Sequence, residues 1–252
     1  NGQPAPKVDL SGRDSTRWLE ALGSPVMEVR LQAQRRLVET QDRSLVPELV
    51  RMTSNTTVDE LNLNPRVLHA LWTLHGLGAS DAVPLSVLRH ASPAVRRAAV
   101  MTLPADGWTA ADWKQLLVSE TDAQVRLAAL LTIADRGNTA SIFPLIEAFQ
   151  NPQNTTDPWI KDALTAAGTQ HHQAFLTSSL SVAPTTSGAL EVLRTVARHH
   201  AATEPNALRL ALAAAGAPPT VSAAILEGLT AGWPAQRIPA LTPNTIAQIQ
   251  AA

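Results

Sequence analysis

The chain has no cysteine, no tyrosine and only three phenylalanines among its 252 residues. The missing cysteine excludes a disulfide, a thiol nucleophile, cysteine-ligated zinc and a covalently attached c-type haem within this sequence. Neither sign of charge is in excess, because 20 Lys and Arg stand against 21 Asp and Glu. A balanced chain has no general attraction to nucleic acid or anionic lipid, and no apolar run approaches the ~20 residues of a membrane-spanning helix. We therefore expect neither a nucleic-acid partner nor membrane insertion of this segment.

The apolar residues that are present are mostly small. Alanine, leucine and valine supply most of the 45% apolar fraction, which suits closely packed helices, whereas a strand-rich fold needs more aromatic and β-branched residues. Residues 1–13 contain Pro and Gly without periodicity, which predicts a linker. The sequence starts without an initiator Met or an apolar signal core. That start indicates a processed protein or a fragment of a longer multidomain protein.

A short phrase recurs about every 30 to 40 residues. It begins with Val or Ile, often has a cation at the next position, and carries small or apolar residues three and four positions on; its first residues are Val29, Val67, Val95, Val125 and Ile160. Such periodicity is typical of stacked helix pairs. It predicts an all-α protein over residues 14–252, an α-solenoid of helix pairs with a right-handed superhelix.

Cap residues followed by proline mark several of the expected helix starts, since the pair satisfies a free N–H group and presets φ. They are Ser24-Pro25, Asn64-Pro65, Ser92-Pro93, Asp157-Pro158 and Thr242-Pro243, and Asp122 takes the same place without proline. Glycines, Gly78 and Gly168 among them, are expected to end helices in the left-handed conformation. Between the phrases, and after them, further helices are expected over 14–22, 44–53, 81–90, 109–119, 139–150, 187–200, 204–215, 220–231 and 242–252.

The cation that follows the first residue of the phrase is Arg30, Arg96, Arg126 or Lys161. In a stack of repeats these side chains fall in register and can bridge to carboxylates or carbonyl groups of the adjacent repeat. We expect a structural ladder, with an interaction surface for an acidic partner as the alternative.

The densest cluster of chemically versatile residues lies on one expected helix. His69 and Trp72 share a face of it, Gly76 lets a neighbour pack closely, and His75 points elsewhere. We expect a buried, hydrogen-bonded histidine beside a packed tryptophan. The pairs His171-His172 and His199-His200 diverge on a helix, so one pair cannot chelate a metal well; only a site that joins both pairs would do so. Asn154-Thr155-Thr156 is expected to be a polar loop tip.

Taken together, these phrases resemble HEAT repeats. A narrower resemblance, over roughly residues 7–107, is to the HEAT region of exported bacterial proteins described as membrane-bound dehydrogenases with a haem-binding CxxCH domain, abundant in planctomycetes. The resemblance implies an upstream sugar-dehydrogenase-type propeller, a downstream cytochrome-like domain and a periplasmic or exported location. The phrases that carry it are Asp9-Leu10-Ser11, Trp18-Leu19-Glu20-Ala21-Leu22, Val29-Arg30-Leu31-Gln32-Ala33 and His69-Ala70-Leu71-Trp72.

The leading hypothesis is a non-catalytic scaffold that positions such domains, or a partner protein, without a cofactor or metal of its own. One alternative is a HEAT-like nucleic-acid-binding protein or DNA glycosylase, with the ladder cations on phosphates and Trp108 and Trp113 as lesion-holding rings. Another is a HEAT protein of the tetrapyrrole-lyase type.

Overall fold

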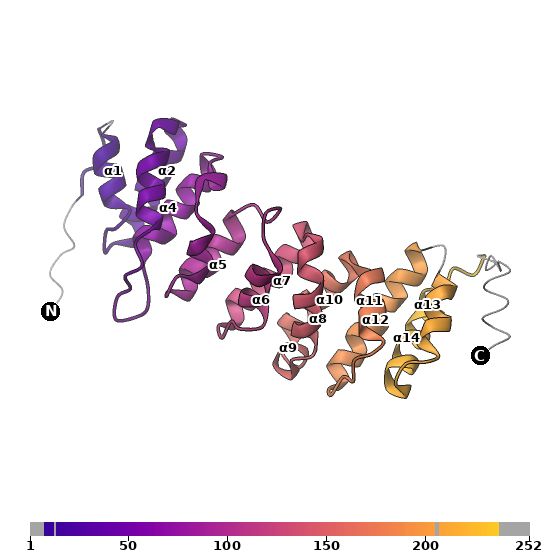
Figure 1. The fold of residues 1–252 in the computed structure, drawn as a ribbon. Helices are drawn as coiled ribbons and strands as arrows, with labels where there is room; N and C mark the ends of the chain where they lie inside the picture. The colour runs from indigo at the N-terminus through magenta and orange to yellow at the C-terminus, as the bar shows by residue number, and fades with distance from the viewer. Residues whose placement is uncertain (1–7, 13, 205–206, 237–252) are drawn as a thin grey trace. The chain divides into compact units, whose positions relative to one another are not determined.

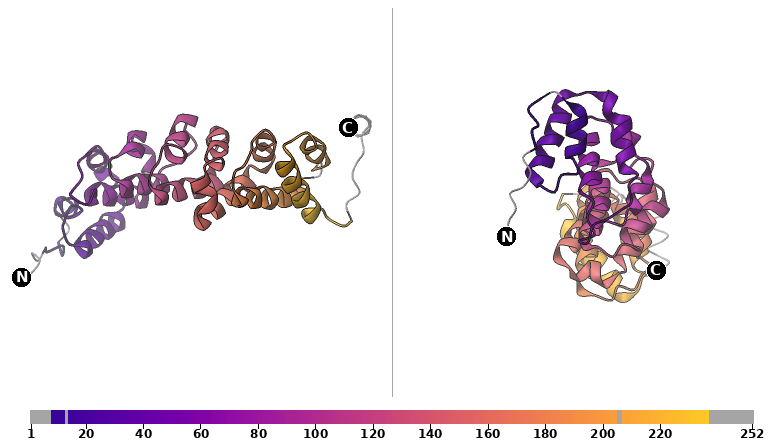
Figure 2. Two further views of the ribbon diagram at one scale, coloured as in Figure 1. Left: turned by 90° about the horizontal axis from the view of Figure 1, so that it is seen from below. Right: turned by 90° about the vertical axis from the view of Figure 1, so that its left-hand side faces the viewer.

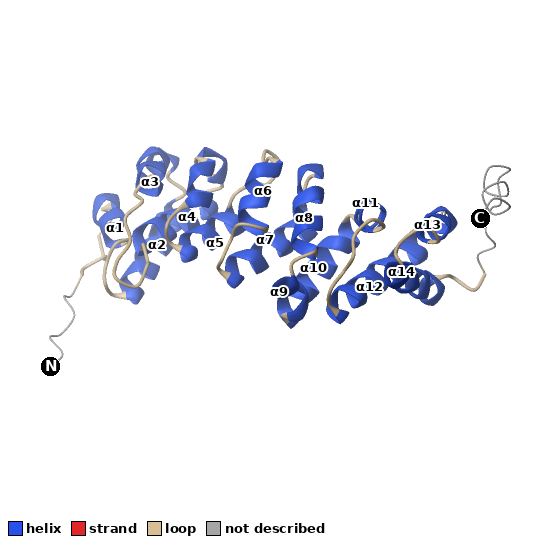
Figure 3. Ribbon diagram, turned by 60° about the horizontal axis from the view of Figure 1, so that its bottom comes forward, coloured by secondary structure: helices blue, strands red, loops and turns tan. Residues whose placement is uncertain are grey.

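The computed structural model describes residues 8–12, 14–204 and 207–236, which form helices, turns and loops without any strand (Figure 3). The predicted all-α class is therefore confirmed. Within the described residues, every helix is too short or too polar to cross a bilayer. The chain divides into two compact units, residues 1–104 and residues 105–252, where the sequence had led us to expect one continuous array.

Unit 1 pairs short first helices with longer second helices (Figure 1). The helix α1 packs against α2, α3 packs against α4, and α2, α4 and α5 contact one another in that order. The segment expected to be a linker is partly packed, because Leu10 is buried and its carbonyl accepts from Trp18 Nε1 at 3.3 Å. The elements are α1 (Ser15–Ala21), α2 (Met27–Thr40), η1 (Arg43–Leu45), α3 (Val46–Thr53), α4 (Pro65–Gly76), η2 (Ser80–Ala82), η3 (Leu85–Arg89) and α5 (Pro93–Thr102).

The prediction of a helix over 81–90 is wrong. Two 3₁₀ turns, η2 and η3, take its place. Between them Val83 is extended, with φ −81° and ψ 128°. The cause is Pro84, since a proline ring disfavours helical backbone in the residue before it and cannot donate a backbone hydrogen bond.

In unit 2 the second helices α7, α10, α12 and α14 contact one another in series. Figures 2 and 3 show α10, α12 and α14 in one row and α8, α11 and α13 in a second row beside it. The short helix α9 packs against both α10 and α12. The elements are α6 (Ala110–Leu117), α7 (Ala123–Arg136), η4 (Thr139–Ser141), α8 (Ile142–Phe149), α9 (Pro152–Thr156), α10 (Pro158–Gln170), α11 (His172–Ser179), α12 (Ser187–Thr203), α13 (Ala207–Ala214) and α14 (Pro219–Gly232).

Most of the cap signals work as expected. The side chains of Asn64, Asp122 and Asp157 each accept backbone N–H groups of the helix that follows, and α5 begins directly after Ser92. Two serines depart from the expectation: the Ser92 side chain makes no cap hydrogen bond, and the Ser24 hydroxyl accepts from Val26 N in a turn, so that α2 begins only at Met27. Thr242-Pro243 and the helix expected over 242–252 lie outside the described residues.

Small and apolar residues of the phrase are buried in the second helices. The residues three and four positions after its start are all buried in the repeats that start at Val67, Val95, Val125 and Ile160. Gly78 has the left-handed φ expected of a helix end, 63°. Gly168 instead lies inside α10, where a Cβ would come within 3.1 Å of Val196 and 3.4 Å of Phe175. Gly168 therefore does not end the helix. Its lack of a side chain lets Val196 and Phe175 approach α10 closely.

Candidate functional site

The arginines of the phrase hold the turn before their own helix. Nη1 of Arg30, Arg96 and Arg126 each donates to the backbone carbonyl six residues earlier, which belongs to Ser24 (2.7 Å), His90 (2.8 Å) and Glu120 (2.9 Å). Arg96 and Arg126 also donate to the carbonyl five residues earlier, at 3.0 and 3.1 Å. The arginine at the second position of the phrase thus makes the same hydrogen bond in three repeats, where it stabilises the turn before its own helix.

Arg30, Arg126 and Lys161 also contact the following helix pair. Nε of Arg30 donates to His69 Nε2 at 3.2 Å, and Nε of Arg126 donates to Asn154 Oδ1 at 3.0 Å. Lys161 Nζ pairs with Glu191 at 2.5 Å. The first two partners are neutral and largely buried, whereas the third pair is open to solvent.

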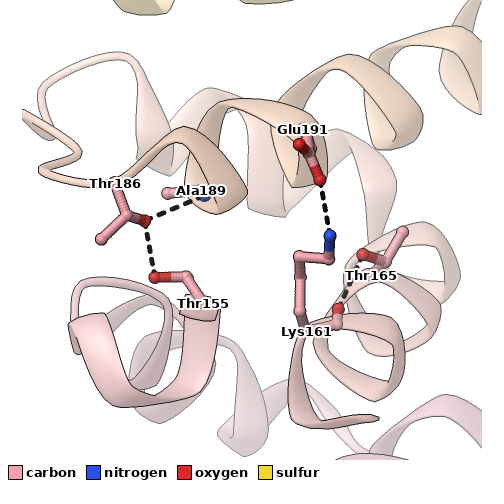
Figure 4. A network of polar contacts seen from close by, with 6 residues as sticks. All are labelled: Thr155, Lys161, Thr165, Thr186, Ala189 and Glu191. Atoms are coloured by element: carbon pink, nitrogen blue, oxygen red, sulfur yellow. Dashed lines mark hydrogen bonds and ion pairs between the residues drawn. The ribbon is translucent and has the colours of Figure 1, made fainter. Parts of the chain in front are cut away.

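The lysine contact belongs to a polar junction between α9, α10 and α12 (Figure 4). Beside the Lys161–Glu191 ion pair, the hydroxyls of Thr155 and Thr186 lie 2.7 Å apart. Thr186 Oγ1 also accepts from Ala189 N at 3.1 Å and so caps α12. Two polar contacts, one on each side, therefore fix the start of α12 against the preceding pair.

Arg30, His69 and Trp72, all singled out by the sequence, meet in unit 1 around a hollow of about 420 Å³. Arg30, Gln34 and Leu31 come from α2, His69 and Trp72 from α4. Further apolar lining comes from Met27, Leu63, Leu68 and Ala94. We call this hollow the unit 1 groove.

His69 lies at the centre of a hydrogen-bonded chain in this groove. Its Nε2 accepts from Arg30 Nε, so the ring proton sits on Nδ1 and is donated to Gln34 Oε1 at 2.7 Å. Burial of the ring, and secondarily the charge of Arg30, lowers the pKa of His69 to about 4. Both ring nitrogens are thus hydrogen-bonded to neighbours while the ring is neutral, so His69 orients Arg30 and Gln34.

Gly76 and His75 behave differently from His69. A Cβ at Gly76 would lie 2.6 Å from Val38 of α2, so the glycine is what allows α2 and α4 to approach. His75 is exposed and stands edge-on to Trp72, with ring centroids 5.9 Å apart. His69 and His75 do not share a site.

The two histidine pairs meet in unit 2 around His172, whose ring lies edge-on to both His199 and His200, with ring centroids 5.4 and 5.0 Å apart. The Nδ1 atoms of His172 in α11 and His200 in α12 lie 2.8 Å apart. Burial is the largest cause that lowers the pKa of both rings, with mutual charge repulsion among the histidines second. In the described part of the chain, no group of three or more His, Asp or Glu side chains is placed to hold a metal ion.

Two residues in these contacts were not anticipated from the sequence. Gln34 follows Arg30 by four positions, so helical spacing alone puts both on one face. Asn154 was assigned to a loop tip but is buried in α9, where its side-chain amide also donates to the Ala148 carbonyl at 3.0 Å. The signal for α9 was present, because Asn151-Pro152 has the same cap-proline pattern and Asn151 caps the helix.

No family model matches this sequence, and no curated protein shows significant similarity to it.

Proposed function

We propose that the chain is a HEAT-like α-solenoid scaffold that binds protein partners and performs no chemistry itself. The observation that carries the proposal is the series of second helices α7, α10, α12 and α14, with Arg126 and Lys161 each linking its helix to the next pair. The small residues of the phrase are buried and the second helices contact one another in series, as in repeat arrays, which are stabilised by contacts between neighbouring repeats. The groove lined by Arg30, His69 and Trp72 supplies a surface for a partner.

The setting we propose is an exported bacterial redox enzyme in which the scaffold positions a propeller and a cytochrome-like domain. This part rests on the sequence resemblance alone. It is tested by titrating the purified chain with separately produced propeller and cytochrome-like domains of such an enzyme in a calorimeter. Saturable binding supports the setting, whereas sugar oxidation or haem binding by the chain alone would overturn the scaffold proposal.

The alternative of a nucleic-acid-binding protein or DNA glycosylase loses support from two observations. The guanidinium groups of Arg30, Arg96 and Arg126 donate to protein carbonyls. Trp108 and Trp113 are 2% and 0% exposed and contact each other at a tilt of 50°, with ring centroids 4.6 Å apart, so neither ring is open to a flipped base. Salt-dependent retention on DNA at low ionic strength would revive the alternative. Among the residues that the structure describes, no contact favours a tetrapyrrole-lyase activity over the scaffold.

The architecture itself is tested by small-angle X-ray scattering. A compact domain of this length has a radius of gyration of about 18 Å. A solenoid of stacked pairs should exceed that value clearly, because each pair extends the stack. A measured radius near the compact value would contradict the solenoid.

A further inference from the structure

The rim of the unit 1 groove is apolar and exposed. Met27 is 57% exposed, Leu31 46% and Leu63 39%, and all three line the same hollow. Single exposed apolar residues are ordinary on protein surfaces. A cluster of three around one hollow, with Trp72 in its wall, is a candidate binding surface.

The lining of the groove includes one cation, Arg30. Arg30 is half-buried and uses Nε for His69 and Nη1 for the Ser24 carbonyl, both of which are neutral. In the described ranges, no carboxylate forms an ion pair with it. A ligand that covered Arg30 with apolar groups alone would strip water from the guanidinium without compensation. Charge complementarity therefore requires the ligand to bring an anionic acceptor, for which a carboxylate matches the guanidinium geometry.

We propose that the unit 1 groove binds a short segment of a partner protein that carries a large apolar side chain beside an Asp or Glu. The apolar side chain fills the hollow between Leu31 and Trp72, and the carboxylate pairs with Arg30. A protein segment fits better than a small amphiphile, because the loop that leads to Leu63 exposes two further apolar side chains, Leu61 at 76% and Val58 at 37%, which only a longer ligand can use. This inference rests on the proposed scaffold function and names the chemistry of its partner.

The experiment is a selection of random peptides displayed on phage against the full chain, followed by affinity measurement with the selected peptides. The groove variant is Leu31→Lys, which places a charge on the apolar rim at an exposed position where folding is insensitive. The matched control is Leu131→Lys, since Leu131 in unit 2 is 50% exposed. We expect peptides that pair a large apolar residue with Asp or Glu. Their affinity should fall at least about tenfold on Leu31→Lys and stay unchanged on Leu131→Lys.

A second arm tests the carboxylate. Replacing the peptide's Asp by Asn should weaken binding to the native chain and to Leu131→Lys equally, with a loss that shrinks as salt is raised. The same peptide change should matter less on Arg30→Lys, which keeps the charge but loses the two-pronged geometry. Selected peptides without an acidic residue would overturn the carboxylate assignment.

The outcomes separate this inference from the scaffold proposal. Peptides that bind equally to native chain and Leu31→Lys would overturn the groove assignment and leave the scaffold proposal standing. Failure to enrich any peptide, with binding of dodecanoate that is lost on Leu31→Lys, would show a site for a free amphiphile and overturn the protein partner. Failure of both probes would overturn the groove as a binding site. The scaffold proposal would still be tested by the titration with propeller and cytochrome-like domains.

Discussion

Arg126 and Asn154 are 28 residues apart in the sequence, yet Nε of the arginine donates to Oδ1 of the asparagine at 3.0 Å. The arginine is only 7% exposed and the asparagine 1%. The remaining hydrogen bonds of Arg126 go to the carbonyls of Glu120 and Thr121, at 2.9 and 3.1 Å. A buried cation with these three acceptors ties the turn before α7 to α9, so it joins two helix pairs that the chain visits separately.

Replacing Arg126 by Met tests that role. Methionine keeps much of the stem's packing but leaves two buried acceptors, on Glu120 and Asn154, without this donor, so we expect the free energy of unfolding to fall by roughly 2–4 kcal/mol. The matched change is Lys161→Met, which breaks a solvent-open ion pair and should cost about 1 kcal/mol or less. Urea unfolding of both variants gives the comparison. Equal effects would mean that the buried contacts of Arg126 are not formed in solution.

The close approach of α12 and α14 leads to a prediction about Gly228. A Cβ at this position would lie 2.3 Å from the Arg194 carbonyl oxygen, a backbone atom that cannot rotate away. Gly228→Ala should therefore overpack the contact and lower the unfolding free energy by about 1–3 kcal/mol. Gly107→Ala is the control, because nothing lies within 4 Å of its Cβ position. A thermal melt in which both variants behave alike would argue against this packing of α12 on α14.

Local patterns predicted the helices well where capping and periodicity agreed. Thr109 and Asp112 form the capping box that their spacing indicates, and α6 follows it. The patterns failed where proline can either start or interrupt a helix. Asn64 before Pro65 starts α4, whereas Pro84 separates two 3₁₀ turns where a helix was expected. The division into two units could not be predicted from capping or periodicity, because it depends on tertiary packing between helix pairs.

The sequence predicted which residues form the site but not which of them contact one another. Helical spacing identified Arg30, His69 and Trp72, and the structure brings them to one groove. It could not show that Arg30 reaches from α2 to His69 of α4, because their separation of 39 residues is bridged only by tertiary packing. The contact between His172 and His200 was missed for the same reason.

The neutral state of His69 makes unit 1 sensitive to acid. Its pKa is about 4 in the fold, chiefly because the ring is buried, against about 6.5 when unfolded. The unfolded chain binds more protons between these values, so this contribution to stability is lost as the pH falls from about 6.5 towards 4, by at most about 1.4 kcal/mol per pH unit. His69→Gln keeps hydrogen-bonding groups without titrating. Its urea midpoint should change less between pH 7 and pH 5 than that of the native chain; an equal change would place the acid sensitivity elsewhere.

The contact between His172 and His200 should give α11 a similar pH dependence, in unit 2. One Nδ1 atom must donate and the other accept across 2.8 Å, so protonation of both rings removes the acceptor and places two charges together. Because burial lowers the pKa of both rings, the folded state resists protonation that the unfolded state accepts, and stability falls as the pH drops below about 6.5.

Amide hydrogen exchange over His172–Ser179 should therefore be faster at pH 5.5 than at pH 7.5, after correction for the intrinsic exchange rate. His172→Phe keeps a ring but cannot titrate, so the difference should shrink in that variant. His75→Phe, at an exposed histidine of unit 1, should leave it unchanged. Equal pH dependence of α11 exchange in the native chain and His172→Phe would rule out this histidine contact as its origin.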